Sequence, residues 1–185
     1  MPNVTHPIPP VSVAVAAIIL RDTQARLGDI ISKEIYPCAP QTTAGKRRMF
    51  DEVDILGLRV FAHLAGSNTC SNQREAGQMA CSVVQWMRSP MPKGSSLHRV
   101  LFPTNWSYSS GVPLYKTEDG KLVDGNGQPP VDEEDYGGRS ATTVYVSLNL
   151  ADIRSVFRQK LEDGTLLLSS SGSIKVNNTS GLEAE

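Results

Sequence analysis

Apolar residues recur along the first half of this chain at spacings of three and four, which predicts amphipathic helices. The first apolar run extends from Val11 to Leu20 and ends at the polar triplet Arg21-Asp22-Thr23. A second helix is predicted over Gln24 to Tyr36, with Thr23 as its N-cap because a threonine hydroxyl can accept a hydrogen bond from a first-turn amide. Gly28 weakens this helix by about 1 kcal/mol relative to Ala. The inward positions of the second helix are Leu27, Ile30, Ile31 and Ile35.

A third helix is predicted to start at residue 51 or 52. Asp51 is a good N-cap, and Asp54 places a second carboxylate in the first turn, where free backbone amides and the helix dipole favour negative charge. The residues that follow form one apolar stripe, so this helix packs against another element. The stripe consists of Val53, Leu56, Val60, Phe61 and Leu64.

A fourth helix has the clearest pattern in the chain. Asn72 and Glu75 form a capping box at its start. Its apolar residues are spaced as on one helix face, and core packing explains them better than a partner-binding face. They are Ala76, Met79, Ala80, Val83, Val84 and Met87. The segment after it contains two prolines and small polar residues, which cannot continue a helix. We therefore predict a domain over residues 11–89 and a linker over residues 90–96.

The second half predicts a small α+β domain over residues 97–176. Asp119-Gly120 is a strong turn signal, and Lys121–Val123 can return as a hairpin partner. The other predicted strands are His98–Phe102, Val112–Lys116, Thr142–Leu148, Leu166–Leu168 and Ile174–Val176. A helix is predicted between the strands Thr142–Leu148 and Leu166–Leu168, and it ends at Gly164. Its inward stripe is formed by Ile153, Val156, Phe157 and Leu161. The fold class is therefore α+β, and residues 1–10 and 177–185 are expected to be flexible ends.

The region before the third helix carries three adjacent cations, Lys46, Arg47 and Arg48. Such a cluster is also typical of a solvated turn. However, the order helix, short turn, helix, basic segment, helix is that of a winged helix-turn-helix, in which the second helix enters the major groove and the wing touches phosphate. Glutamine and arginine side chains can read base edges, and four polar residues would lie on the exposed side of the second helix. These are Gln24, Arg26, Asp29 and Lys33.

The stretch from Gly45 to Arg59 reads GKRRMFDEVDILGLR. It resembles the wing, the aromatic residue and the Asp-containing third helix of the DNA-binding domain of MerR-like regulators and of excisionase-type winged helices. The resemblance covers about residues 11–88. It implies that Arg47 and Arg48 contact phosphates, that Phe50 packs the wing on the domain, and that Arg59 supports the wing or contacts the DNA backbone. Together with the exposed side of the second helix, the predicted DNA-binding residues are Gln24, Arg26, Lys33, Lys46, Arg47, Arg48 and Arg59.

The formal net charge of −1 hides two halves of opposite sign. Residues 1–100 contain 11 Lys and Arg against 7 Asp and Glu, which gives +4, and residues 101–185 contain 7 against 12, which gives −5. This asymmetry suits a nucleic-acid module joined to a module that binds something else, or two halves that attract each other. The acidic run Asp132–Asp135 favours a solvated loop over a metal site or a DNA mimic.

The cysteines and the apolar runs bear on the compartment. Cys38, Cys70 and Cys81 form no CxxC pair and have no histidine at zinc-ligand spacing, so we expect reduced thiols in a cytosolic protein. The longest apolar run, Val11 to Leu20, is too short to span a bilayer and follows no basic segment. We therefore predict a cytoplasmic protein without a membrane span.

The motif inventory argues against an enzyme. The chain contains no phosphate loop, dinucleotide fingerprint, GxSxG elbow or HExxH motif, and its three histidines are far apart in sequence. No cofactor is expected.

Two hypotheses remain. The first is a bacterial or phage protein that binds specific double-stranded DNA, either as a monomer or as a homodimer on two half-sites. The second is a protein-interaction module, such as an inhibitor, toxin or adaptor, in which a repurposed winged helix acts on a replication, transcription or proteolysis partner. The C-terminal half is a possible contact for a protein partner.

Overall fold

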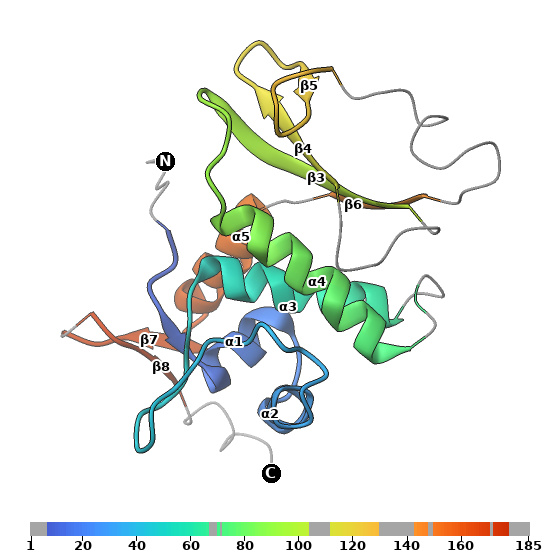
Figure 1. The fold of residues 1–185 in the computed structure, drawn as a ribbon. Helices are drawn as coiled ribbons and strands as arrows, with labels where there is room; N and C mark the ends of the chain where they lie inside the picture. Colours follow the sequence, from blue (N-terminus) through green and yellow to red (C-terminus); the bar gives the residue numbers. More distant parts are fainter. Residues whose placement is uncertain are drawn as a thin grey trace. The chain divides into compact units, whose positions relative to one another are not determined.

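The computed structural model describes residues 7–66, 70, 72–103, 112–129, 143–147, 150–170 and 172–177 (Figure 1). These residues form helices and small antiparallel sheets, and the N-terminal region is mostly helical, so the predicted α+β fold class is confirmed. The acidic run Asp132–Asp135 lies outside the described residues, as do residues 1–6 and 178–185 of the two ends predicted to be flexible.

The elements agree closely with the sequence patterns. The helices are α1 (Val13–Leu20), α2 (Gln24–Ser32), α3 (Glu52–Gly66), α4 (Gln73–Arg88) and α5 (Leu150–Glu162). The strands are β1 (Val11–Ser12), β2 (Met49–Phe50), β3 (Ser95–Pro103), β4 (Val112–Thr117), β5 (Leu122–Val123), β6 (Thr143–Ser147), β7 (Leu166–Leu168) and β8 (Ile174–Val176).

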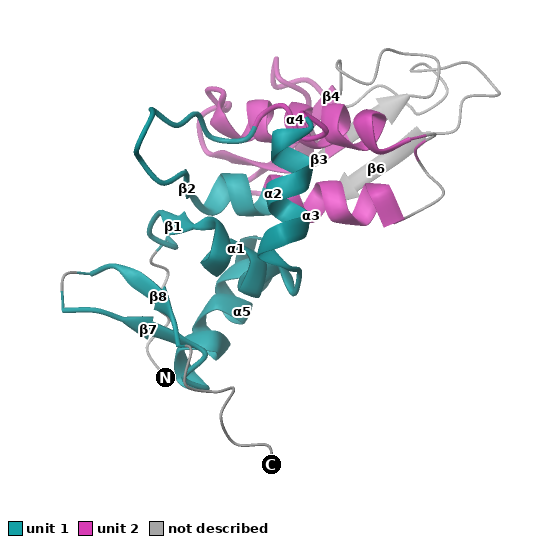
Figure 2. Ribbon diagram, turned by 90° about the horizontal axis from the view of Figure 1, so that it is seen from below, with its two compact units in different colours: residues 1–33, 39–56, 149–185 teal, residues 34–38, 57–148 magenta. Residues whose placement is uncertain are grey.

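The chain divides into two compact units, which Figure 2 shows in different colours. Unit 1 contains residues 1–33, 39–56 and 149–185, and unit 2 contains residues 34–38 and 57–148. The division therefore runs through α3. It does not follow the expected order of two successive domains. Residues 90–96 lie inside unit 2, and α5 with the β7–β8 hairpin, expected in the second domain, belongs to unit 1.

In unit 1, α1 and α2 are joined by a short polar turn. Arg21 ends α1 in the left-handed conformation, with φ of 56°. Thr23 is the N-cap of α2 as predicted, because its Oγ1 accepts a hydrogen bond from the Arg26 amide at 3.2 Å. The helix ends at Ser32, earlier than the predicted Tyr36. Glu34 has φ of 53°, a left-handed conformation that cannot continue a right-handed helix.

Strand β2, in the segment that the sequence predicts as a wing, pairs with β1. β2 is antiparallel to β1, with Val11 opposite Phe50, and both side chains are buried. Phe50 therefore packs its segment on the core of unit 1, and the wing itself stays a prediction. Figure 1 shows the residues before β2 as a loop that projects from the helices of unit 1. At the start of α3, the Asp54 amide donates to Asp51 Oδ1 at 2.9 Å, and the Asp51 amide donates to Asp54 Oδ2 at 3.0 Å. These reciprocal bonds confirm the predicted helix start.

The C-terminal part of unit 1 packs on the first helix. α1 contacts both α5 and β8. Gly164 ends α5 with φ of 75°, as the sequence predicts. The chain then forms the antiparallel β7–β8 hairpin, in which Leu166 pairs with Val176. Leu166 and Ile153 are 1% exposed. These two buried residues attach the hairpin and α5 to the core of unit 1.

Unit 2 combines a helix with a four-stranded antiparallel sheet. The strand order is β5-β4-β3-β6, and α4 contacts β3. Asn72 Oδ1 accepts a hydrogen bond from the Glu75 amide at 3.0 Å, which confirms the predicted start of α4. Five of the six predicted core residues of α4 are buried, and Met87 is half-buried. The five are Ala76, Met79, Ala80, Val83 and Val84.

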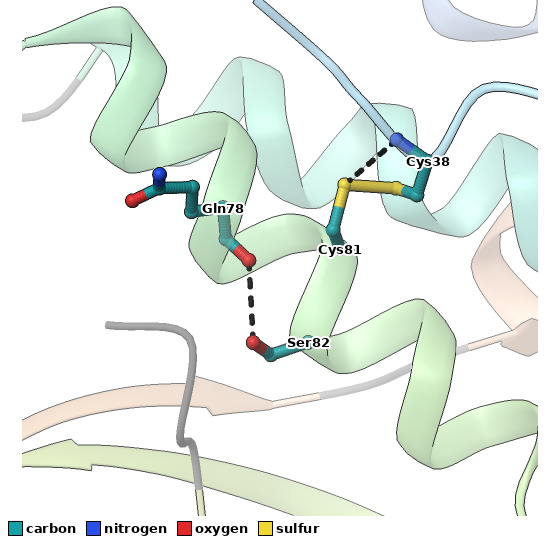
Figure 3. The surroundings of a disulfide bond; sticks show 4 residues. All are labelled: Cys38, Gln78, Cys81 and Ser82. Atoms are coloured by element: carbon teal, nitrogen blue, oxygen red, sulfur yellow. Dashed lines mark hydrogen bonds between the residues drawn. A yellow bond between two sulfur atoms is a disulfide. The ribbon is translucent and has the colours of Figure 1, made fainter. Parts of the chain in front are cut away.

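A disulfide attaches residues 34–38 to α4 within unit 2. Cys38 and Cys81 are bonded, with their Cα atoms 5.4 Å apart, and the Cys38 amide also donates to Cys81 Sγ (Figure 3). The expectation of reduced thiols is therefore wrong for this pair. The two residues are 43 positions apart, a spacing that carries no pairing signal in the sequence. Cys70 is a free thiol, and burial, with a smaller effect from Glu75, raises its pKa.

Candidate nucleic-acid interface

A groove of about 640 Å³ lies in unit 1. Three segments that are distant in sequence form its walls. They are α1 with the turn that follows it, the end of the wing with β2, and the β8 strand of the C-terminal hairpin. Its apolar lining includes Ala17, Ile18, Met49 and Val176, and its polar lining includes Asp22, Gln24, Arg47, Ser173 and Lys175. The groove is therefore lined by apolar side chains together with amide, cationic, hydroxyl and carboxylate groups.

Gln24 and Arg47, two of the predicted DNA-binding residues, line this same groove. Gln24 is the first residue of α2, and Arg47 lies just before β2 in the predicted wing. Both side chains are exposed, as is that of Lys46 beside Arg47. None of the three side chains forms an ion pair or a hydrogen bond with the residues that the structure describes. The geometry thus brings together the predicted reading helix and the predicted wing.

Arg26 and Lys33 are exposed on α2 but carry local ion pairs. Arg26 Nη1 lies 3.2 Å from Asp22 Oδ2, and Lys33 Nζ lies 2.7 Å from Asp29 Oδ2. Such i,i+4 pairs at a surface contribute only about 0.3–0.5 kcal/mol. Lys33 can therefore exchange Asp29 for a phosphate at small cost, whereas Arg26 is paired with a carboxylate whose side chain is only 11% exposed. The Arg26 pair also offsets the negative charge that Asp22 brings to the groove.

The remaining two predicted residues are placed differently. Arg48 is half-buried, and its Nε is buried without a hydrogen-bond partner among the described residues. It is therefore less available to phosphate than its two neighbours. Arg59 is exposed on α3 but belongs to unit 2, whereas the other six residues belong to unit 1. Arg59 does not line the groove.

Lys175 is a groove residue that the sequence patterns do not single out. It lies on β8, its side chain is exposed, and it forms no ion pair with any described residue. One lysine in a short strand has no distinguishing pattern. Its position depends on the packing of β8 against α1, a long-range contact that periodicity does not report.

The described residues can also be compared with the requirements of a metal site and of a membrane span. Among them, no group of three or more His, Cys, Asp and Glu side chains is placed to hold a metal ion. No helix in the described part of the chain is both long enough and apolar enough to cross a membrane. The disulfide removes the thiol argument for a reducing compartment, so the cytoplasmic location stays a prediction.

Comparisons with known proteins give no family for this chain. No protein-family model matches it, and no curated protein matches it. The resemblance to MerR-like and excisionase-type domains therefore rests on the residues of the wing and the third helix alone, and it stays a prediction.

Proposed function

We propose that this protein binds specific double-stranded DNA and that unit 1 acts as a winged helix-turn-helix. The observation that carries this proposal is the groove that Gln24 and Arg47 share. In helix-turn-helix proteins, the N-terminal residues of the second helix approach base edges while flanking elements contact the backbone. In unit 1, Gln24 in the first turn of α2 and Arg47 line one groove, which supports this assignment.

The two helix residues have the chemistry needed to read bases. Glutamine can bond an adenine edge with both its donor and its acceptor, and arginine can bond guanine in the same bidentate manner. Gln24 and Arg26 are both exposed in the first turn of α2. We therefore assign base contacts to these two residues and a phosphate contact to Lys33 at the end of the helix.

The wing supplies the sequence-independent part of the affinity. Lys46 and Arg47 are exposed and unpaired among the described residues, so no internal ion pair must break before they meet a phosphate. Each phosphate contact releases condensed counterions, which makes the affinity fall steeply with salt. Their role is to hold the domain in register while α2 reads the groove.

The double variant Lys46→Ala/Arg47→Ala tests this assignment. We expect it to lower the affinity for duplex DNA roughly ten- to hundred-fold at 0.1 M salt, because two phosphate contacts are lost. The matched control is Lys93→Ala/Lys116→Ala, which removes the same charge from exposed and unpaired positions of unit 2. Equal losses in the two variants would show a non-specific charge effect and contradict the assignment.

A protein partner is the second candidate function, and exposed apolar surface on β7 favours it. Leu167 is 48% exposed and Leu168 is 63% exposed. Exposed apolar surface is a feature of protein-interaction sites when it is contiguous. A pull-down from nuclease-treated extract would compare the wild type with Leu167→Ser/Leu168→Ser. A stoichiometric partner lost in the variant supports this candidate, and no partner with the wild type removes its support.

A further inference from the structure

We infer that the β7–β8 hairpin is a second wing, and that Lys175 on β8 contacts a phosphate of the DNA held by the first wing. This inference rests on the proposed function. Its starting observation is that Lys175 lines the same groove as Gln24 and Arg47. Three segments from distant parts of the sequence therefore present polar side chains to one ligand.

The charges along the groove suit a polyanion. Arg47 and Lys175 are its two lining cations, and neither forms an ion pair with the described residues. Asp22 is the carboxylate in the lining, and its charge is offset by Arg26 at 3.2 Å. A phosphate backbone that follows the groove would thus meet unpaired cations on β8 and on the first wing.

The hairpin is built to hold Lys175 in place before DNA arrives. At its tip, the Ser169 and Ser173 hydroxyls lie 2.7 Å apart, and the Ser169 amide donates to the Ser173 carbonyl at 2.9 Å. At its base, Asn177 Nδ2 donates to the Gly164 carbonyl at 3.0 Å. A preorganised element loses less conformational entropy on binding than a mobile tail does. The hairpin can therefore act as a wing rather than as a loose basic arm.

The hairpin also belongs to the unit that contains the first wing. Its first strand continues from α5, and β8 contacts α1. On α5, Arg154 bonds to Glu52 of the same unit at 2.6 Å. Lys175 and Arg47 therefore belong to one packed unit and line one groove, so a single polyanion in the groove can contact both.

The salt dependence of DNA affinity tests the role of Lys175. With a duplex of random sequence, we expect Lys175→Gln to reduce the magnitude of the slope of log K against log salt by about 0.9. If the two proteins bind equally at 1 M salt, this change in slope makes the affinity of the variant about eight-fold lower at 0.1 M salt. Lys175→Arg keeps the charge and should keep the wild-type slope.

The control is Lys160→Gln, which removes a lysine of the same unit that does not line the groove. Its slope should equal that of the wild type. A wild-type slope in Lys175→Gln would overturn the second wing while leaving the proposed function intact. No salt-dependent binding by the wild type would overturn both. Equal urea midpoints for Lys175→Gln and the wild type would show that the exposed substitution leaves the fold intact.

Discussion

Arg154 Nε donates a hydrogen bond to Glu52 Oε1 at 2.6 Å, although the two residues are 102 positions apart in the chain. The Glu52 side chain is 8% exposed, and its other oxygen accepts a bond from the Ile8 amide at 3.3 Å. One carboxylate at the start of α3 therefore joins the N-terminal segment to α5 within unit 1. This contact adds a polar link to the apolar packing by which Ile153 and Leu166 attach α5 and the hairpin to the core of unit 1.

We expect Arg154→Ala to lower the free energy of unfolding by about 1–3 kcal/mol, because a nearly buried carboxylate loses a charged hydrogen-bond partner. Urea denaturation with a common m value measures this loss. The double variant Glu52→Gln/Arg154→Met should lose less, since it leaves no buried charge. A loss below 0.5 kcal/mol in Arg154→Ala would be typical of a surface pair and would contradict the role given to this contact.

The disulfide determines how many cysteines can react with a thiol reagent. Cys38 and Cys81 are bonded and Cys70 is free, so the unfolded but unreduced chain should react with one equivalent of a thiol reagent. After reduction it should react with three, the number of cysteines in the chain. Three reactive thiols without reductant would show that the bond is absent from the purified protein.

The same bond should stabilise the fold. It closes a loop of 43 residues, for which the chain-entropy model predicts roughly 4 kcal/mol of stabilisation as an upper value. We expect Cys38→Ser/Cys81→Ser to lower the free energy of unfolding, measured by urea denaturation under oxidising conditions, by up to this amount. Under reducing conditions, the variant and the wild type should converge. Cys70→Ser is the control, and an equal loss in it would contradict this account.

Two glycines should respond oppositely to alanine. Gly28 lies in α2 with open space around its Cα, so Gly28→Ala should stabilise the protein by about 0.5–1 kcal/mol. Gly77 lies in α4, where an added Cβ would overlap the Ile35 carbonyl oxygen. Gly77→Ala should therefore destabilise unit 2. Thermal denaturation of both variants measures the difference, and a destabilised Gly28→Ala would show that α2 is not the exposed helix described here.

The local parts of this fold could be predicted from the sequence because their causes are local. Thr23, Asp51 and Asn72 each precede a helix and bond to its first-turn amides, and such caps involve residues only three apart. The apolar stripe of α4 likewise follows from helical spacing. Short-range chemistry of this kind is visible in a single sequence.

The long-range parts could not be predicted in this way. Tyr36 was expected in the second helix, but it is buried in unit 2 with its ring 6.0 Å from that of Phe61, and tertiary packing outweighs helical periodicity there. The pairing of Cys38 with Cys81 and the position of Lys175 in the groove have the same origin. Each depends on contacts between segments whose distance in the sequence carries no signal.

We expect the Asp119 carboxyl, in the turn between β4 and β5, to make the stability of the protein depend on pH. The side chains of Lys121 and Thr117 bond to the Asp119 carboxylate and lower its pKa to about 2. A lowered folded-state pKa contributes stability that is present above the ordinary pKa and is lost as the pH falls through about 2. Carboxyl ¹³C NMR should place the Asp119 midpoint well below that of an ordinary aspartate. In Lys121→Ala the midpoint should rise, and an unchanged midpoint would exclude Lys121 as the main cause.

The proposed function requires that unit 1 contacts DNA phosphates. Fluorescence anisotropy of the wild-type protein against a random-sequence duplex, over a series of salt concentrations, measures this contact. We expect an association constant whose logarithm falls linearly and steeply with log salt, by about 0.9 for each phosphate contacted. No binding at the lowest salt concentration, or binding that does not change with salt, would contradict the proposed function.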